Sequence, residues 1–93
     1  MTSGGPKTFL VESYVRQLDA AAAAAIALRF AAATADLQQR GAVVVWLRSI
    51  ALLGEETYFG LFSAESIEQV VDAAEQAGVG VDHVGEVVAI EPR

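Results

Sequence analysis

Residues 42–62 read AVVVWLRSIALLGEETYFGLF, and they predict two strands joined by a tight turn. The first run, 42–53, is apolar apart from Arg48 and Ser49 and is rich in the β-branched and aromatic side chains that favour strands. A short polar break, GEE at 54–56, is interpreted as a solvated turn rather than a paired-carboxylate site. Residues 57–62 resume the strand pattern, so the two runs are expected to pair as an antiparallel hairpin.

A strand and a helix are predicted before this hairpin. Residues 8–15 send alternate side chains to two faces, with Glu12 and Tyr14 on the face opposite Phe9. Six consecutive alanines at 20–25 begin a helix, because alanine is the best helix former. Asp19 can cap its start, and Gly41 follows its end. The apolar stripe of this helix consists of Ile26, Phe30, Ala33 and Leu37.

A second helix and a fourth strand are predicted after the hairpin. Ser66 and Gln69 have the spacing of a capping box, and Gly78 ends the helix that follows. The apolar face of that helix consists of Ile67, Val70, Val71, Ala74 and Ala77. The last strand is expected over 81–91, interrupted by Gly85 and closed by Pro92.

The predicted order of elements is βαββαβ, which indicates an α+β fold of ferredoxin-like type. This order places four strands in one antiparallel sheet, with the first strand beside the third, the second at an edge, and both helices on one face. The other face is left open, yet residues 42–53 are apolar on both sides. A second copy of the chain is the simplest cover, so we expect a homodimer; the alternative is a monomer with an exposed apolar face.

Size and composition limit the possible functions. The 93 residues suit a single domain, expected over 8–93 after a flexible leader at 1–7. Six basic and twelve acidic residues give a net charge of −6, which argues against nucleic acid as a partner. Arg29 interrupts the most apolar segment, so no membrane span is expected. The chain has no cysteine, which indicates a cytoplasmic location and removes thiolate metal sites.

Glu12 and Arg48 are the candidate binding residues. Each is a charge in the middle of a predicted strand, where an unpaired ion is costly, so each needs a partner or a wet cavity. One interpretation is an ion pair, within or between chains, that fixes the register. The other is an anion-binding or acid–base site with Tyr14, Trp46 or Tyr58 as its walls.

Five segments of the chain carry a family resemblance: LVESY at 10–14, WLRSI at 46–50, EETYF at 55–59, LFSA at 61–64 and AGV at 77–79. Together they resemble the small ferredoxin-like family of nickel-binding-protein-like domains of unknown function. The resemblance covers residues 8–91 and implies a dimeric α/β sandwich or barrel. It also implies nickel binding, as in some relatives, and no established reaction.

His83 is the candidate metal ligand. Nickel and similar divalent transition metals favour imidazole nitrogen supplemented by carboxylate oxygen, and His83 is the only histidine in the sequence. Asp82 and Glu86 are near it in sequence, but Asp82 and His83 face opposite sides of a strand. Further ligands can come from a second chain; the alternative is that His83 is a surface or interface residue.

Reaction motifs are missing from the sequence. One histidine and no cysteine exclude a Cys–His pair, and no G-x-S-x-G, P-loop or dinucleotide motif occurs. Noncatalytic binding of a metal ion or small ligand is therefore the first hypothesis. A cofactor-independent enzyme acting on a small hydrophobic substrate in the cavity of a dimeric barrel is the second, and a protein-interaction module is the third.

Overall fold

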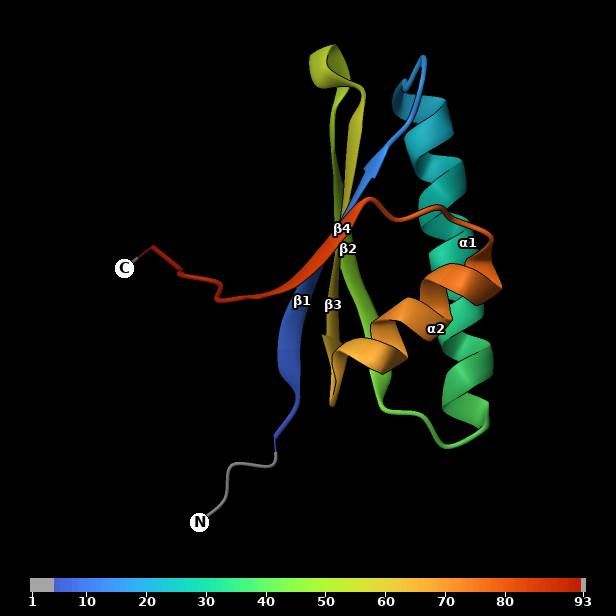
Figure 1. The fold of residues 1–93 in the computed structure, drawn as a ribbon, viewed down its shortest axis with the longest axis vertical. Coiled ribbons are helices and arrows are strands. Elements are labelled where there is room, and N and C mark those ends of the chain that lie inside the picture. Colours follow the sequence, from blue (N-terminus) through green and yellow to red (C-terminus); the bar gives the residue numbers. More distant parts are fainter. Residues whose placement is uncertain (1–4, 93) are drawn as a thin grey trace.

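A computed structural model describes residues 5–92 and confirms the predicted order of elements. Its strands form one antiparallel sheet in the order β2-β3-β1-β4, as the ferredoxin-like prediction requires. Both helices lie on the same side of this sheet (Figure 1). The elements are β1 (Lys7–Tyr14), α1 (Ala20–Gln39), β2 (Val44–Leu52), the 3-10 turn η1 (Leu53–Glu55), β3 (Thr57–Ala64), α2 (Ile67–Ala77) and β4 (His83–Val87).

The ends of the helices follow the sequence in all but one respect. The Asp19 carboxylate accepts a hydrogen bond from the Ala22 N–H at 2.8 Å, and Gly41 and Gly78 take the left-handed conformation after α1 and α2. The capping box predicted for α2 is wrong in its serine half, because the Ser66 side chain makes no capping hydrogen bond. Gln69 instead accepts from the backbone N–H of Glu65, one residue further back.

The core lies between the helices and the sheet and centres on three aromatic rings. Phe30 of α1 packs edge-on against Phe62, with ring centroids 4.9 Å apart, and lies 6.1 Å from the ring of Tyr58. Gly60 separates the two β3 aromatics, and a Cβ at that position would lie 3.0 Å from the Phe62 ring. The predicted stripe of α1 faces this core, with Ile26, Phe30 and Ala33 buried and Leu37 packed beside them.

Each strand differs from its predicted range at one end or both, and β4 differs most. β1 begins at Lys7, which was placed in the leader; residues 1–4 of that leader lie outside the described residues. β4 was expected over 81–91 but ends at Val87, whose partner across the ladder is Thr8. Because β1 begins at Lys7, one residue before Thr8, the chain beyond Val88 has no residue of β1 opposite it.

A bulge in β2 decides which side chains reach the helices. Trp46 pairs with Phe62 and Arg48 pairs with Leu61, so Leu47 is an extra residue without a partner on β3. Regular alternation would put Arg48 on the helix side and Ser49 on the other. The extra residue reverses this, and Arg48 lies on the open side while Ser49 lies opposite Gly60 on the helix side.

Helix α1 is long and apolar enough, by length and composition alone, to cross a membrane. The prediction that no membrane span occurs depended on Arg29. This one charge does not lower the mean hydropathy of α1 enough to exclude a span. Core helices of soluble proteins pass the same test. In this structure α1 covers the sheet and buries Ile26, Phe30, Ala33 and Thr34 in doing so (Figure 1).

Candidate functional site

The face of the sheet away from the helices, called the open face below, carries the predicted charged residues. The register of the strands aligns Ile50, Phe59, Glu12 and His83 in one row across β2, β3, β1 and β4. The next row consists of Arg48, Leu61, Leu10 and Gly85. Exposed apolar side chains accompany these charges, mainly on β2, namely Val45, Leu47, Ile50 and Leu52.

Glu12 and His83 are direct cross-strand neighbours within this face. Their Cα atoms are partners in the antiparallel β1–β4 ladder, a position in which Cβ atoms lie roughly 4.5–5.5 Å apart. His83 is exposed and Glu12 is half-buried. The imidazole leans over Gly85, since a Cβ at that glycine would lie 3.9 Å from His83 Nε2. The structure therefore brings together a nitrogen donor and a carboxylate that the sequence analysis treated as separate candidates.

Glu12 and Arg48 lie in different rows, with β3 between their strands. Within residues 5–92 the ion pair that forms is Arg40 with Asp36 on α1, at 2.9 Å. The predicted ion pair of Glu12 with Arg48 is thus not formed within one chain. A pair between chains stays a prediction.

Tyr14, predicted as a wall of the site, stands at the end of the open face and is held by Glu56. Its hydroxyl donates to Glu56 Oε1 at 3.0 Å. This hydrogen bond, together with the negative charge of Glu56 and a small desolvation, raises the pKa of Tyr14. The backbone N–H of Tyr14 donates to Asp82 Oδ2 at 2.7 Å, so the Asp82 carboxylate is already engaged.

The other two predicted walls, Trp46 and Tyr58, lie on the helix side of the sheet and do not share a site with Glu12. Trp46 Nε1 donates to Ser49 Oγ at 2.9 Å, and Ser49 Oγ is also hydrogen-bonded to the Tyr58 hydroxyl. Burial raises the pKa of Tyr58, and the hydrogen bond with Ser49 lowers it in part. This chain of hydrogen bonds could not be predicted from the sequence, because it is the bulge at Leu47 that brings Ser49 to the helix side.

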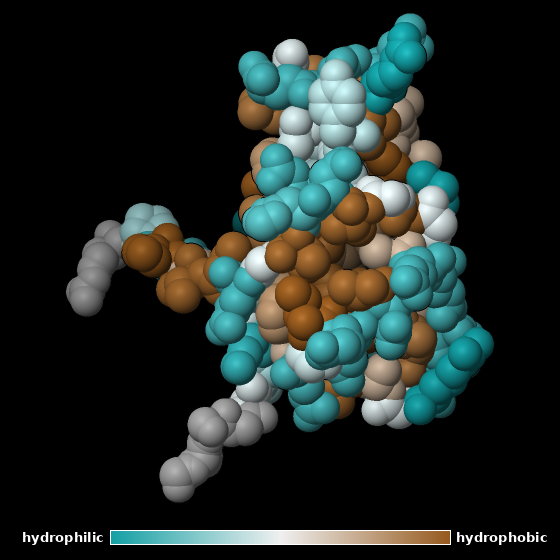
Figure 2. Space-filling model, viewed as in Figure 1, coloured by the Kyte–Doolittle hydropathy of each residue, from teal (hydrophilic) through white to brown (hydrophobic). Residues whose placement is uncertain are grey.

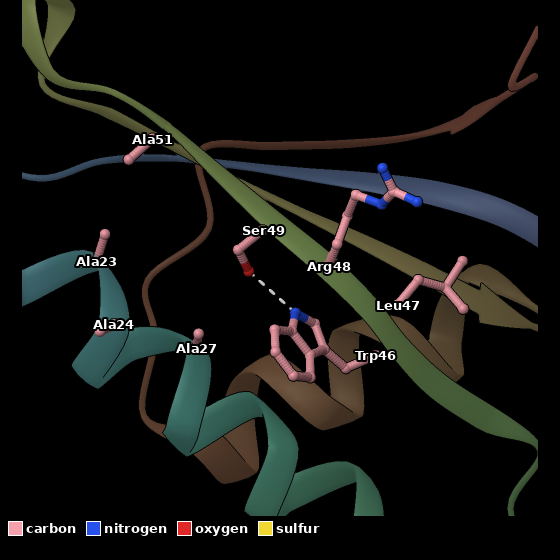
Figure 3. A pocket seen from close by; sticks show the side chains of 8 residues that line it. All are labelled: Ala23, Ala24, Ala27, Trp46, Leu47, Arg48, Ser49 and Ala51. Carbon is pink, nitrogen blue, oxygen red and sulfur yellow. Dashed lines mark hydrogen bonds between the residues drawn. The ribbon is translucent and has the colours of Figure 1, made fainter. Parts of the chain in front are cut away.

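An open pocket of about 320 Å³ lies beside this chain of hydrogen bonds, between α1 and β2. In Figure 3 the Trp46 ring and the Ser49 hydroxyl lie on the side of α1, whereas the Arg48 guanidinium points away from that helix. The space exists because α1 presents methyl groups rather than larger side chains at this point. Its lining consists of Ala23, Ala24 and Ala27 from α1 and Trp46, Leu47, Arg48, Ser49 and Ala51 from β2.

One protomer does not assemble a complete metal site. Among residues 5–92, no group of three or more His, Cys, Asp and Glu side chains is placed to hold a metal ion. The Glu12–His83 pair supplies two donors, and strong sites for borderline divalent metals gather more than two. Any site built on this pair needs further donors.

Comparisons with known proteins support the fold. No family model matches the chain, and no curated protein matches it. The chain is similar to the crystal structure of SCO4226 from Streptomyces coelicolor A3(2), with a TM-score of 0.76 and 19% sequence identity over 90% of this chain and 99% of that one. At this identity the likeness shows the ferredoxin-like α+β fold, and the predicted resemblance to nickel-binding-protein-like domains stays a prediction.

Proposed function

We propose that the protein is a homodimeric, noncatalytic binding protein of the cytoplasm that packs two open faces together and holds a divalent metal ion or small ligand between them. The observation that carries the proposal is the pairing of His83 with Glu12 on an open face whose β2 side chains are mainly apolar. Together they offer a nitrogen donor and an oxygen donor on a face whose apolar side chains favour a cover.

The apolar side chains of β2 support the dimer. Ile50, in the same row as Glu12, is 62% exposed, and Val45 and Leu52 flank it along the strand. Removing such side chains from water is favourable in proportion to the apolar area covered. A second copy of the chain offers the same apolar surface, and two-fold symmetry makes it self-complementary.

The chemistry of the pair supports a divalent transition metal, with nickel as the first candidate. Imidazole nitrogen together with carboxylate oxygen suits nickel, zinc and copper. A two-fold axis near the Glu12–His83 row brings two imidazoles and two carboxylates to one place, which is the number of donors that a single chain lacks. Arg48 in the adjacent row supports the other version of the proposal, a small anionic ligand.

The proposal is tested by calorimetric titration of nickel chloride into the parent protein and into His83→Ala and Glu12→Gln. Both variants are expected to weaken binding by at least roughly tenfold, because loss of even an outer-shell partner has that effect. Glu68→Gln, an exposed carboxylate on α2, is the matched control and is expected to bind as the parent does. Unchanged binding by His83→Ala, or no binding by the parent, would remove the metal from the proposal.

The pocket beside Trp46 favours a second candidate, binding of a small hydrophobic molecule, as a cofactor-independent enzyme on this fold would require. Trp46 is the only tryptophan, so its fluorescence reports occupancy directly. Small phenols and aromatic hydrocarbons are expected to change the emission of the parent but not of Ala27→Leu, whose larger side chain fills the pocket. A heterologous protein that displaces the homodimer would instead favour the interaction-module hypothesis.

A further inference from the structure

The hydrogen bonds among Trp46, Ser49 and Tyr58 limit where the Ser49 hydroxyl can donate. A hydroxyl group offers one proton and two lone pairs, whereas an indole N–H can only donate. Trp46 Nε1 donates to Ser49 Oγ at 2.9 Å and so occupies one of its lone pairs. The contact between Ser49 Oγ and the Tyr58 hydroxyl is compatible with either group as the donor, so the surroundings of the two groups decide its direction.

The burial of Tyr58 settles which group donates. Its side chain is fully buried, and Ser49 Oγ is the partner that its hydroxyl finds among residues 5–92. If Ser49 donated, the tyrosine proton would be left in the core without an acceptor, which folded proteins avoid because of its cost. Tyr58 therefore donates, and Ser49 Oγ accepts from two side chains at once.

The proton of Ser49 is left for the pocket between α1 and β2. Both lone pairs of the oxygen are taken, and the Ser49 hydroxyl forms no other hydrogen bond within residues 5–92. Ser49 is half-buried and lines the pocket, and its hydroxyl lies on the side of α1 (Figure 3). The pocket thus contains one O–H donor whose oxygen is held by two neighbouring side chains.

The rest of the pocket favours a small, uncharged and mainly apolar ligand. Its α1 side consists of the methyl groups of Ala23, Ala24 and Ala27, and the Arg48 guanidinium points away from that helix (Figure 3). The net charge of −6 disfavours an anion further. The volume of about 320 Å³ is at the small end of the range for ligand pockets. One small molecule with a single hydrogen-bond acceptor fits these conditions.

We propose that the pocket takes a small, uncharged carbonyl compound, a ketone or aldehyde whose oxygen accepts a hydrogen bond from Ser49. The inference rests on the second candidate function, binding in this pocket, and adds the class of ligand. A carbonyl oxygen accepts without bringing a proton of its own, which suits a serine oxygen whose lone pairs are both taken. A hydrocarbon of the same shape fills the pocket but leaves the Ser49 proton unpaired, which costs affinity.

Cyclohexanone and methylenecyclohexane are the matched probes, because they have nearly the same shape and differ in the acceptor. Their dissociation constants are measured from the emission of Trp46, the only tryptophan, in Ser49→Thr and Ser49→Val. Threonine keeps the hydroxyl, and valine puts a methyl group in its place. The ratio of the methylenecyclohexane constant to the cyclohexanone constant is expected to be roughly threefold to tenfold higher in Ser49→Thr than in Ser49→Val. Ser63→Val, on the opposite face of the sheet, is the matched control and is expected to keep the parent's ratio.

Two further measurements test the inference without the valine variant. In a crystal structure of the parent with cyclohexanone, the ketone oxygen is expected within hydrogen-bond distance of Ser49 Oγ. If Ser49 donated to Tyr58 instead, Tyr58→Phe would release the Ser49 proton and raise the ratio of the two constants above the parent's. That increase, a ketone oxygen turned away from Ser49, or equal ratios in Ser49→Thr and Ser49→Val would overturn the carbonyl site and leave binding in the pocket standing. A parent that binds neither probe would overturn the pocket candidate and this inference together.

Discussion

At the scale of single residues, Glu56 is the side chain whose importance is least visible in the sequence. Its carboxylate accepts from the Tyr14 hydroxyl at 3.0 Å and from the Gln17 N–H at 2.5 Å, and its backbone carbonyl accepts from the Val15 N–H at 2.8 Å. Glu56 and Gln17 both have positive φ, at 51° and 57°. One carboxylate thus fastens the segment before α1 to the turn before β3.

The Tyr14–Glu56 contact predicts a measurable shift at alkaline pH. The hydrogen bond and the charge of Glu56 raise the pKa of Tyr14, so the contact stabilises the fold below the ordinary tyrosine pKa of about 10 and loses that effect as pH rises through the higher folded value. Glu56→Gln is expected to bring the Tyr14 pKa back toward its ordinary value in an ultraviolet titration. Tyr14→Phe identifies the transition, because the only other tyrosine is Tyr58. A Tyr14 transition that Glu56→Gln leaves in place would contradict this account.

Some residue-level features could be predicted from local sequence, and others could not. The roles of Asp19, Gly41 and Gly78 depend on a few neighbouring residues, and all three were predicted correctly. The contacts of Glu56 join positions 39 and 42 residues apart, which is why its turn was interpreted only as solvated. The Glu12–His83 pairing needs the register of β1 on β4, which the uncertain start of β4 left undefined.

At the scale of elements, β2 shows how one extra residue changes which groups can meet. A strictly alternating strand predicted from 42–53 would put Trp46 and Arg48 on the same face. The bulge at Leu47 separates them, so that Arg48 joins the open face while Ser49 completes the hydrogen bonds of Trp46 and Tyr58. Periodicity in the sequence could not reveal this, because 42–53 is apolar on both faces and contains no glycine that would mark a bulge.

Deletion of Leu47 tests this account of β2. Removing the unpaired residue leaves Trp46 and Arg48 on the partners that they already have, so the variant is expected to fold with a loss of no more than about 1–2 kcal/mol in the free energy of unfolding. Deletion of Ile50, which is paired with Phe59, shifts the neighbouring residues to the wrong faces and is expected to cost considerably more. Urea unfolding of both variants gives the comparison, and equal losses would contradict the bulge.

At the scale of the whole molecule, the distribution of apolar side chains favours assembly. A chain of 93 residues buries only about 60–65% of the surface that its unfolded state exposes, so its core is small. Long α1 adds Ile26 and Phe30 to that core, and its other buried residues are small. Several large apolar side chains are exposed on β2, and Val88 and Ile90 after β4 are exposed as well. The homodimer predicted from 42–53 stays a prediction, and it would cover the exposed side chains of β2.

The two neighbouring residues Val45 and Trp46 distinguish this interface from the core. Val45 lies on the open face opposite Ser63, whereas Trp46 packs on the helix side opposite Phe62. Val45→Glu is expected to give a folded monomer in light scattering, because it places a charge in the predicted interface without disturbing the core.

Trp46→Glu is expected to lower the melting temperature by several degrees, because it places a charge beside the core and removes the indole donor to Ser49. Leu28→Glu, on the exposed side of α1, is the matched control and is expected to remain dimeric with an unchanged melting temperature. A Val45→Glu variant that stays dimeric would place the interface elsewhere on the molecule.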